Sequence, residues 1–365
     1  MQRRTFLGLG GALLAASALG GWTLGRSAGQ QPLLLSARND ADGRHYAVGY
    51  RLDGQRQFAI PVSERCHDVV PHPTLALALF VGRRPSRESY LIDTRDGRLL
   101  QTVASPAQRH FQGHAVFHRG GEWLYSTEND SGEPGRGVIG VWRLDGNQLQ
   151  RVDELSSHGI GPHQLLWLPD GERLVVANGG IRTEADSREK MNLDAMEPSL
   201  VLLQRDGTLI SKEQLPERMN SVRHLAVAGD GTVVSGQQYE GDPADAVPLV
   251  AIKRPGQAFQ PFPLGEAQRQ VMHQYTASVA IHSGLRLLAI TAPRGNRVFI
   301  WDLDSAALRL DAPLPDCAGV AACAEGFVVS SGQGRCRLYD CRQAEISMQA
   351  LQLPVGLWDN HLRLA

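Results

Sequence analysis

The chain has 365 residues, of which 39 are glycine and 6% are aromatic, and its formal net charge is −1. This near balance of charge excludes the strongly basic footprint of a protein that binds nucleic acid. The length is sufficient for one large closed hydrophobic core.

The chain begins with a segment that is typical of an export signal. Arg3 and Arg4 precede Thr-Phe-Leu and an apolar stretch rich in glycine and alanine. A twin arginine in this setting indicates Tat export, and an ordinary secretory signal with chance arginines is the alternative. We therefore assign residues 1–28 to a Tat signal peptide and linker and residues 29–365 to a single domain. We expect a periplasmic protein, and no later stretch is long enough to span a bilayer.

Short apolar runs with strand alternation follow the leader, at residues 32–37, 46–50 and 57–60. A longer phrase then recurs: a His or small residue, an apolar strand, a glycine turn and a second apolar strand. Successive copies begin 41 to 61 residues apart, at His67, His114, His163, His224, Ser278, Gly319 and His361. Short strands that repeat at this period are the signature of β-propeller blades.

Each copy continues through a polar loop into two further strands, so one copy supplies the four strands of a blade. The seventh copy ends after one strand, residues 362–365, and the three runs behind the leader can supply its missing strands. We therefore predict an all-β fold, a seven-bladed β-propeller whose N- and C-terminal strands close one shared blade and leave no open edge. Six or eight blades are the alternatives. The longest interval carries an insertion, residues 182–198, that is expected to form a short helix or a lid.

Five of the seven repeat positions are histidines, and the inner strands of a propeller converge on its axis. Imidazole is a common ligand for copper, zinc, iron and nickel. The candidate ligands of a transition metal, copper or iron, are therefore His67, His114, His163, His224 and His361. The alternative is structural, with each histidine bonded to a carbonyl or an Asp of its own blade. Ser278 and Gly319 leave two blades without a ligand.

Other polar residues mostly follow the second strand of their blades, which places them on the same face as the ring. The candidate ligand-binding residues are Arg65, His110, Glu128, Asn129, Asp130, Asn178, Arg223, Gln237 and Arg294. The arginines among them offer donors to an anionic ligand. The alternative is that polar loops simply cap the propeller. Three further histidines, His72, His118 and His282, are expected at the surface.

Five cysteines in an oxidising compartment permit one or two disulfides. Four of them fall in the sixth copy, Cys317, Cys323, Cys336 and Cys341, and we expect bridges there without an assignable pairing. Cys66 is either a buried apolar residue or a soft metal ligand. The sequence contains no Cys-x-x-Cys-His, which excludes covalent c-type haem.

Several segments together resemble the bacterial domain-of-unknown-function family 1513, whose members are Tat-exported proteins predicted to be propellers. They lie within residues 35–335 and include residues 109–117, 128–130, 159–163, 177–181, 223–225 and 293–295. Gln164 departs from the family's usual Glu. Relatives tend to be encoded beside imelysin-like and di-haem oxidoreductase-like proteins. The resemblance therefore implies such periplasmic partners and a role in iron or copper handling.

Three functions are compatible with these features. The first is a periplasmic propeller that binds copper, iron or a small ligand in a His-lined channel, for metal acquisition or redox handling. The second is a lactonase-like hydrolase of a small anionic substrate, with a histidine as general base. The third is a non-catalytic protein-binding scaffold. In each case we expect a monomer without a nucleic-acid partner and, once the signal is removed, without a membrane span.

Overall fold

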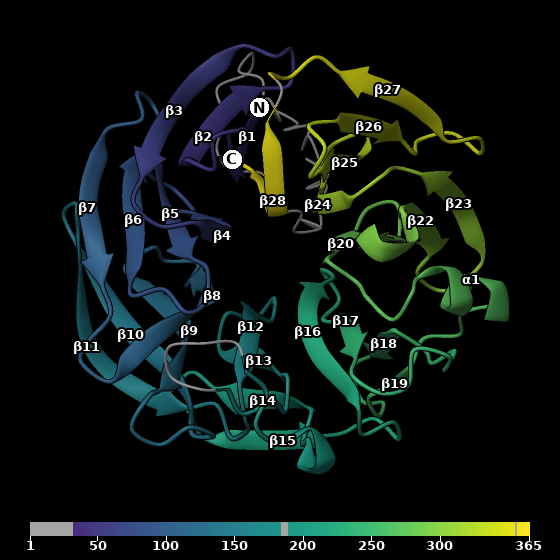
Figure 1. Cartoon of the computed structure of the whole chain (residues 1–365), viewed down its shortest axis with the longest axis horizontal. Coiled ribbons are helices and arrows are strands. Elements are labelled where there is room, and N and C mark those ends of the chain that lie inside the picture. Colours follow the sequence, from purple (N-terminus) through teal and green to yellow (C-terminus); the bar gives the residue numbers. More distant parts are fainter. Residues whose placement is uncertain (1–31, 184–188, 355) are drawn as a thin grey trace, which may run out of the picture.

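The computed structural model describes residues 32–183, 189–354 and 356–365, and the predicted leader lies outside these ranges. Seven four-stranded antiparallel sheets stand in a ring around a central axis (Figure 1). This confirms the predicted seven-bladed β-propeller. Within the described ranges, none of the helices has the length and apolar character needed to cross a bilayer.

The first three blades follow one another along the chain, each built from the channel outward. Blade 1 contains β4 (Cys66–Pro71), β5 (Leu77–Gly82), β6 (Glu88–Asp93) and β7 (Leu99–Ala104). Blade 2 contains β8 (Arg109–Phe117), β9 (Trp123–Asp130), β10 (Gly137–Asp145) and β11 (Gln148–Ser156). Blade 3 contains β12 (Pro162–Trp167), β13 (Arg173–Asn178), β14 (Ser199–Gln204) and β15 (Leu209–Glu213).

The next three blades repeat the same order. Blade 4 contains β16 (Asn220–Val227), β17 (Val233–Tyr239), β18 (Val250–Lys253) and β19 (Gln260–Pro261). Blade 5 contains β20 (Ser278–His282), β21 (Leu287–Ala292), β22 (Arg297–Asp302) and β23 (Leu308–Pro313). Blade 6 contains β24 (Cys317–Ala322), β25 (Gly326–Ser331), β26 (Cys336–Asp340) and β27 (Ser347–Leu351).

Blade 7 is shared by the two ends of the chain, as predicted. Its strands are β28 (Leu357–Leu364), β1 (Leu33–Asn39), β2 (His45–Arg51) and β3 (Arg56–Val62). The C-terminal β28 pairs antiparallel with β1, and backbone bonds of 2.9 Å join Leu33 and Ala365 in both directions. Figure 1 shows β28 beside β1 where the ring closes. Strand β28 begins at Leu357 and is therefore longer than predicted. As a result, His361 lies inside the strand.

The helical segments are few and short. They are η1 (Leu193–Ala195), α1 (Glu266–Val271) and η2 (Pro293–Gly295). The first lies in the predicted insertion, and in the described part of that insertion the expected short helix is a single 3-10 turn. Thr183 and Lys190 form an isolated bridge in the same insertion, and residues 184–188 lie outside the described ranges. The lid stays a prediction.

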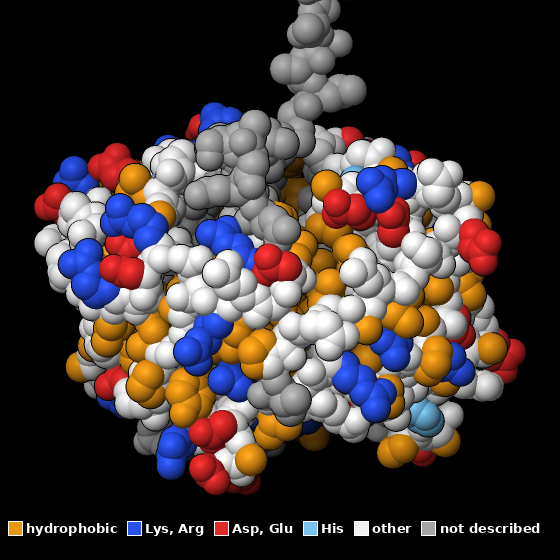
Figure 2. Space-filling model, turned by 90° about the horizontal axis from the view of Figure 1, so that it is seen from above, with side chains coloured by type: hydrophobic (Ala, Val, Ile, Leu, Met, Phe, Trp, Pro, Cys, Tyr) orange, Lys and Arg blue, Asp and Glu red, His pale blue; other side chains and the backbone are white. Residues whose placement is uncertain are grey.

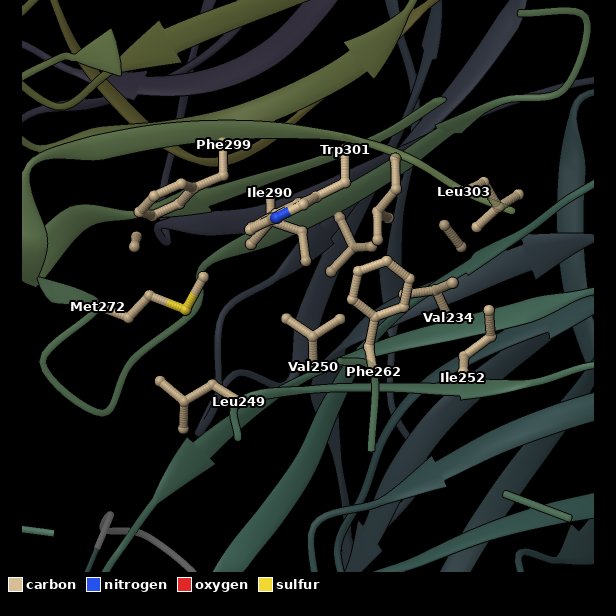
Figure 3. Close-up of a cluster of buried hydrophobic side chains, with 14 of the residues drawn as sticks. Val234, Leu249, Val250, Ile252, Phe262, Met272, Ile290, Phe299, Trp301 and Leu303 are labelled. Atoms are coloured by element: carbon tan, nitrogen blue, oxygen red, sulfur yellow. The ribbon is translucent and has the colours of Figure 1, made fainter. Parts of the chain in front are cut away.

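Apolar side chains fill the spaces between adjacent blades, and alternation along each strand explains how. In β22, Phe299 and Trp301 face blade 4, whereas Val298 and Ile300 belong to the cluster that faces blade 6. Figure 3 shows the interface of blades 4 and 5, where Phe262 packs near Trp301. Each blade therefore buries both faces of its sheet, and the ring is stabilised by its closure.

Two histidines that were expected at the surface are buried, so that prediction is wrong. His72 is 4% exposed and its Nε2–H donates to the carbonyl of Gly121 at 3.1 Å. His118 makes the same contact with Gly171, also at 3.1 Å. Each histidine ends an inner strand and bonds to the turn of the next blade. A Cβ on Gly121 would lie 2.4 Å from the His72 ring, so this approach requires glycine.

The expected disulfides are absent, because all five cysteines, which are all described, are free thiols. In blade 6 the sheet itself separates them. Cys317 and Cys341 belong to the cluster facing blade 5, and Cys323 and Cys336 to the cluster facing blade 7. On each side, one cysteine lies in or directly after β24 and the other in or directly after β26. Because β25 lies between these two strands, the pair is beyond the reach of a disulfide.

Charge on the rim of the ring is mixed. Figure 2 shows lysines, arginines and acidic side chains interspersed among apolar ones on the face it presents. This agrees with the formal net charge of −1.

Candidate metal centre in the channel

The inner strands of five blades bring the five predicted histidines together at the axis. Ring centroids lie 4.7 to 4.9 Å apart around the closed circuit of His67, His114, His163, His224 and His361. Four of these side chains are buried, and His163 is partly exposed. The central prediction, that residues far apart in the sequence meet in the channel, is confirmed.

The two positions without histidine have structural explanations. A Cβ on Gly319 would lie 2.6 Å from the backbone nitrogen of Leu362, so the inner strand of blade 7 passes too close for a side chain there. The Ser278 hydroxyl lies 3.4 Å from Nδ1 of His361 and orients that ring. Both residues therefore position the last histidine of the cluster.

Irregular strand pairing turns four of the five histidines toward the axis. His67 is an extra residue between the pairs Cys66–Gly82 and Asp68–Val81. His163 is likewise extra in β12, and His114 and His361 lie in irregular stretches of β8 and β28. In β16 the extra residue is instead Arg223, and His224 pairs with Gly236. A β-bulge re-aims a side chain away from the regular face of a sheet, so the bulges present these four imidazoles to the channel.

A buried carboxylate orients His114 from the neighbouring blade. Nδ1 of His114 lies 2.8 Å from Oδ2 of Asp68, which also accepts a bond of 2.8 Å from Arg363. Asp68 is 2% exposed. Such a carboxylate fixes the tautomer and directs Nε2 away from it, as second-shell groups do around bound metals.

A second buried carboxylate contacts His67 across the seam where the ring closes. Nδ1 of His67 lies 3.4 Å from Oδ1 of Asp359, and Nε of Arg65 lies 2.5 Å from Oδ2 of the same residue. Burial alone would raise the pKa of Asp359, but the bond to His67 and the charges of Arg83 and Arg65 hold it below its usual value. The carboxylate is therefore ionised.

The sequence analysis missed both aspartates. Asp68 follows a ring histidine directly, and Asp359 precedes one by two residues. That proximity was the available signal. Their partners lie in other blades, however, so the sequence does not show which histidine each of them contacts.

Five imidazole nitrogens of the cluster are buried without a hydrogen-bond partner among the described residues. They are the Nε2 atoms of His114, His163, His224 and His361, and Nδ1 of His224. An unpaired buried polar atom is destabilising, and native proteins leave few of them. Coordination to a metal would satisfy these atoms.

Burial favours the neutral form of four of the five ring histidines. It lowers the pKa of His67 to about 4, against the opposing effect of Asp359. It also lowers the pKa values of His163, His224 and His361 well below the ordinary value, and neighbouring imidazoles add to the effect. Neutral imidazoles have a lone pair free for a metal, with little competition from protons near neutral pH.

The cluster contains two groups of three histidines that could hold a metal ion. His67, His114 and His163 form one, and His114, His224 and His361 form the other, each with ligand nitrogens within 4.8 Å of one another. Two nitrogens bound to one ion lie at most about 4.2 Å apart, so a small rotation of the imidazole rings would bring the nitrogens of either group within this distance. His114 belongs to both and has one nitrogen free of Asp68, so it serves one ion at a time.

The second group fits an ion better. Its three histidines are fully buried, and the Nε2 atom of each lacks a partner among the described residues. Asp68 and Ser278 hold the Nδ1 atoms of His114 and His361, which leaves Nε2 as the ligand. An all-imidazole set suits copper, zinc, iron or nickel.

Cys66, the other soft-ligand candidate, lies in an apolar cluster with Val69 and Phe80. Burial raises the pKa of its thiol well above the ordinary value, and the charges of Asp359 and Glu64 add to this. The residue therefore matches the apolar interpretation.

Among the nine predicted ligand-binding residues, two adjoin the cluster. Arg65 reaches it through Asp359, and Arg223 directly precedes His224 in β16. Arg223 is 7% exposed, and its closest carboxylate contact is 3.9 Å to Glu240.

Three of the nine predicted residues lie at the end of β9, where they contact other residues of blade 2. Glu128 accepts bonds from Ser126 at 2.7 Å and Arg151 at 2.8 Å. Asp130 pairs with Arg109 at 3.0 Å and with Arg136 at 2.9 Å. Asn129, between them, is buried, with Nδ2 unpaired among the described residues. Both carboxylates are thus engaged within their own blade.

The remaining four are distributed over four blades. His110 contacts Ser131 Oγ at 3.2 Å, Asn178 donates to the Ser157 carbonyl at 3.1 Å, and Gln237 donates to Ser235 at 2.6 Å. Arg294 is exposed and lies 4.6 Å from the centre of the Tyr275 ring. A ligand-binding role for these residues stays a prediction.

The family model described as "Protein of unknown function (DUF1513)" matches residues 60–365. The chain belongs to this family. The resemblance noted from sequence segments is thereby confirmed over most of the chain. No curated protein matches the chain in sequence.

Solved structures share the fold of this DUF1513 member at low identity. The periplasmic gluconolactonase PpgL of Pseudomonas aeruginosa is 14% identical, with a TM-score of 0.62, covering 92% of this chain and 99% of that one. Hydrazine synthase of Kuenenia stuttgartiensis is 14% identical, with a TM-score of 0.59, covering 87% and 95%. Saccharomyces cerevisiae Sqt1 is 13% identical, with a TM-score of 0.55, covering 80% and 87%. These similarities show the propeller fold alone.

Proposed function

We propose that the protein binds one transition-metal ion, copper or iron, in its His-lined channel and serves periplasmic metal acquisition or redox handling. The observation that carries this proposal is the convergence of buried imidazoles whose Nε2 atoms lack partners among the described residues. The proposed ligands are His114, His224 and His361. The bound ion would supply Lewis acidity or electron transfer, while the protein supplies the ligands and their orientation.

The structural alternative accounts for less of the cluster. It requires each histidine to be bonded within its own blade, as a brace. His114 and His67 instead contact aspartates of neighbouring blades, Asp68 and Asp359. Both ring nitrogens of His224 lack any partner among the described residues, so a bracing role does not explain it.

The predicted Tat signal supports the same proposal. Export of a folded protein permits a cofactor to be bound before export. Imelysin-like or di-haem periplasmic proteins are the proposed partners, in keeping with the resemblance stated above. The monomeric state is likewise part of the proposal.

The lactonase-like alternative is less favoured, although a gluconolactonase shares the fold. Such a hydrolase needs carboxylates around a divalent cation. The loop carboxylates considered for this role are Glu128, Asp130 and Glu240. Arg151 binds the first, Arg109 and Arg136 bind the second, and Lys190 binds the third. A protein-binding scaffold is the remaining alternative, and it predicts no dependence on metal.

The test is metal uptake by the mature protein. We expect about one equivalent of copper or iron after loading and dialysis, measured by elemental analysis. His114→Gln should lose the ion because His114 belongs to both groups. His273→Asn is the matched control, since His273 is exposed and outside the ring. If the wild-type protein takes up no transition metal and shows no binding on titration, the proposal is wrong.

A further inference from the structure

Arg223 is a buried cation without a full set of partners. Its side chain is 8% exposed, and its Nε atom has no hydrogen-bond partner among the described residues. The Glu240 carboxylate is 3.9 Å away and also forms a close ion pair with Lys190. Two cations therefore share one carboxylate. A buried charge in this state is costly unless a further anion is present.

Strand pairing places Arg223 in the position that His163 holds in the preceding blade. Arg223 is the extra residue of β16, between the pairs Val222–Gln237 and His224–Gly236. His163 is the extra residue of β12 and reaches the ring from that position. Because a bulge re-aims a side chain away from the regular faces of the sheet, the same position brings Arg223 toward the channel beside His163.

Two further observations agree with this placement. Burial is the main cause of the lowered pKa values of His163 and His224, and the charge of Arg223 contributes to both. The guanidinium of Arg223 also packs against Gly179, where an added Cβ would lie 3.4 Å from the central carbon of the guanidinium. Arg223 therefore lies beside the cluster at its one partly exposed histidine, His163.

We propose that Arg223 holds a small anion, an oxyanion or a carboxylate, that reaches the ring beside His163 and completes the coordination of the ion on His114, His224 and His361. This inference rests on the proposed function. Three imidazoles leave a fourth position of a metal open. Imidazole ligands bring no negative charge, so the ion and the guanidinium repel each other unless an anion lies between them. One bound anion would satisfy both charges.

The experiment uses the copper-loaded protein with azide as the probe, because azide bound to copper(II) gives a charge-transfer absorption. We expect saturable binding by the wild type. Arg223→Gln should retain copper and bind azide at least about tenfold more weakly, since it loses a charge-assisted bond. Arg56→Gln is the matched control, because Arg56 is an exposed arginine on the outermost strand of blade 7, and the azide affinity of this variant should be unchanged. Phosphate and acetate then compete against azide, and their order of displacement assigns the class of anion.

Equal azide affinity in the wild type and Arg223→Gln would overturn the inference. If the wild-type protein takes up no copper, the metal proposal fails separately, and calorimetry with inorganic phosphate on the metal-free protein decides about Arg223. Phosphate binding that Arg223→Gln removes supports the anion site, and absence of binding overturns it. If Arg223→Gln does not fold, Arg223→Lys replaces it, with weaker binding expected because the fork of donors is lost.

Discussion

At the scale of single residues, the ring histidines differ in what holds them. His114 is bonded to Asp68 and His67 to Asp359, whereas His224 has no protein partner on either nitrogen among the described residues. A residue kept for structure would be expected to use its polar atoms. A substitution at His224 can therefore distinguish a role in metal binding from a role in folding.

Replacing His224 by leucine should abolish metal binding without weakening the metal-free fold. The substitution removes a proposed ligand but breaks no hydrogen bond given by the structure, so the free energy of unfolding should stay within about 1 kcal/mol of wild type or rise. His114→Leu should lose metal and also about 1–3 kcal/mol, because Asp68 loses its partner. Metal titration and denaturant unfolding measure both effects. Wild-type copper affinity in His224→Leu would contradict the assignment.

The metal-free protein should lose stability as the pH falls from about 6.5 toward about 4. Burial lowers the pKa of His67 to about 4 and those of His163, His224 and His361 further. In this interval the unfolded chain binds protons that the folded one does not. Each such proton costs about 1.4 kcal/mol per pH unit. Thermal unfolding across this range should show a steep decline, shallower in His224→Leu. A flat profile would mean that the imidazoles are not buried in neutral form.

At the scale of elements, the β-bulges determine in which direction four of the five histidine side chains point. In the bulge of β8, residues 112–114 lie opposite a single residue of β9. The bulge requires Gly113, which has a φ of +107° and no room for a side chain beside His67. A regular strand would have carried the same histidine on one of the packed faces of its sheet.

Gly113→Ala should destabilise the protein more than an alanine at an unconstrained glycine. The new Cβ combines backbone strain with overlap on His67, and we expect a loss of about 2–4 kcal/mol. Gly43→Ala is the control, since Gly43 has a φ of +79° with nothing within 4 Å. Its cost should be about 1 kcal/mol. Equal melting temperatures for the two variants would show that the contact with His67 does not matter.

At the scale of the whole molecule, the proposed ligands connect blades that are distant in the ring. His114 belongs to blade 2, His224 to blade 4 and His361 to the C-terminal strand of blade 7. The last of these strands closes the propeller against β1. A metal ion at the axis would thus hold the closing strand as well as its own site.

Copper should therefore raise the unfolding temperature, and a chelator should reverse the rise. A ligand that binds only the folded state stabilises it by about 2.7 kcal/mol when its concentration is 100 times its dissociation constant. Scanning calorimetry with and without copper measures the shift. His224→Leu should show none, whereas His273→Asn should behave as wild type. A shift of equal size in His224→Leu would indicate that copper binds elsewhere.

The sequence by itself determined the strands, the seven blades, their closure by the two ends and the meeting of five histidines. These follow from alternation and from a repeat that any propeller must place around one axis. Only the tertiary structure decided which groups surround those histidines. The contacts of Asp68 and Asp359, the buried positions of His72 and His118 and the free cysteines of blade 6 depend on neighbouring blades and strands. Such contacts join residues that are tens to hundreds of positions apart. The register shifts that orient the histidine side chains arise from pairing between strands, and a periodic sequence pattern does not encode that pairing.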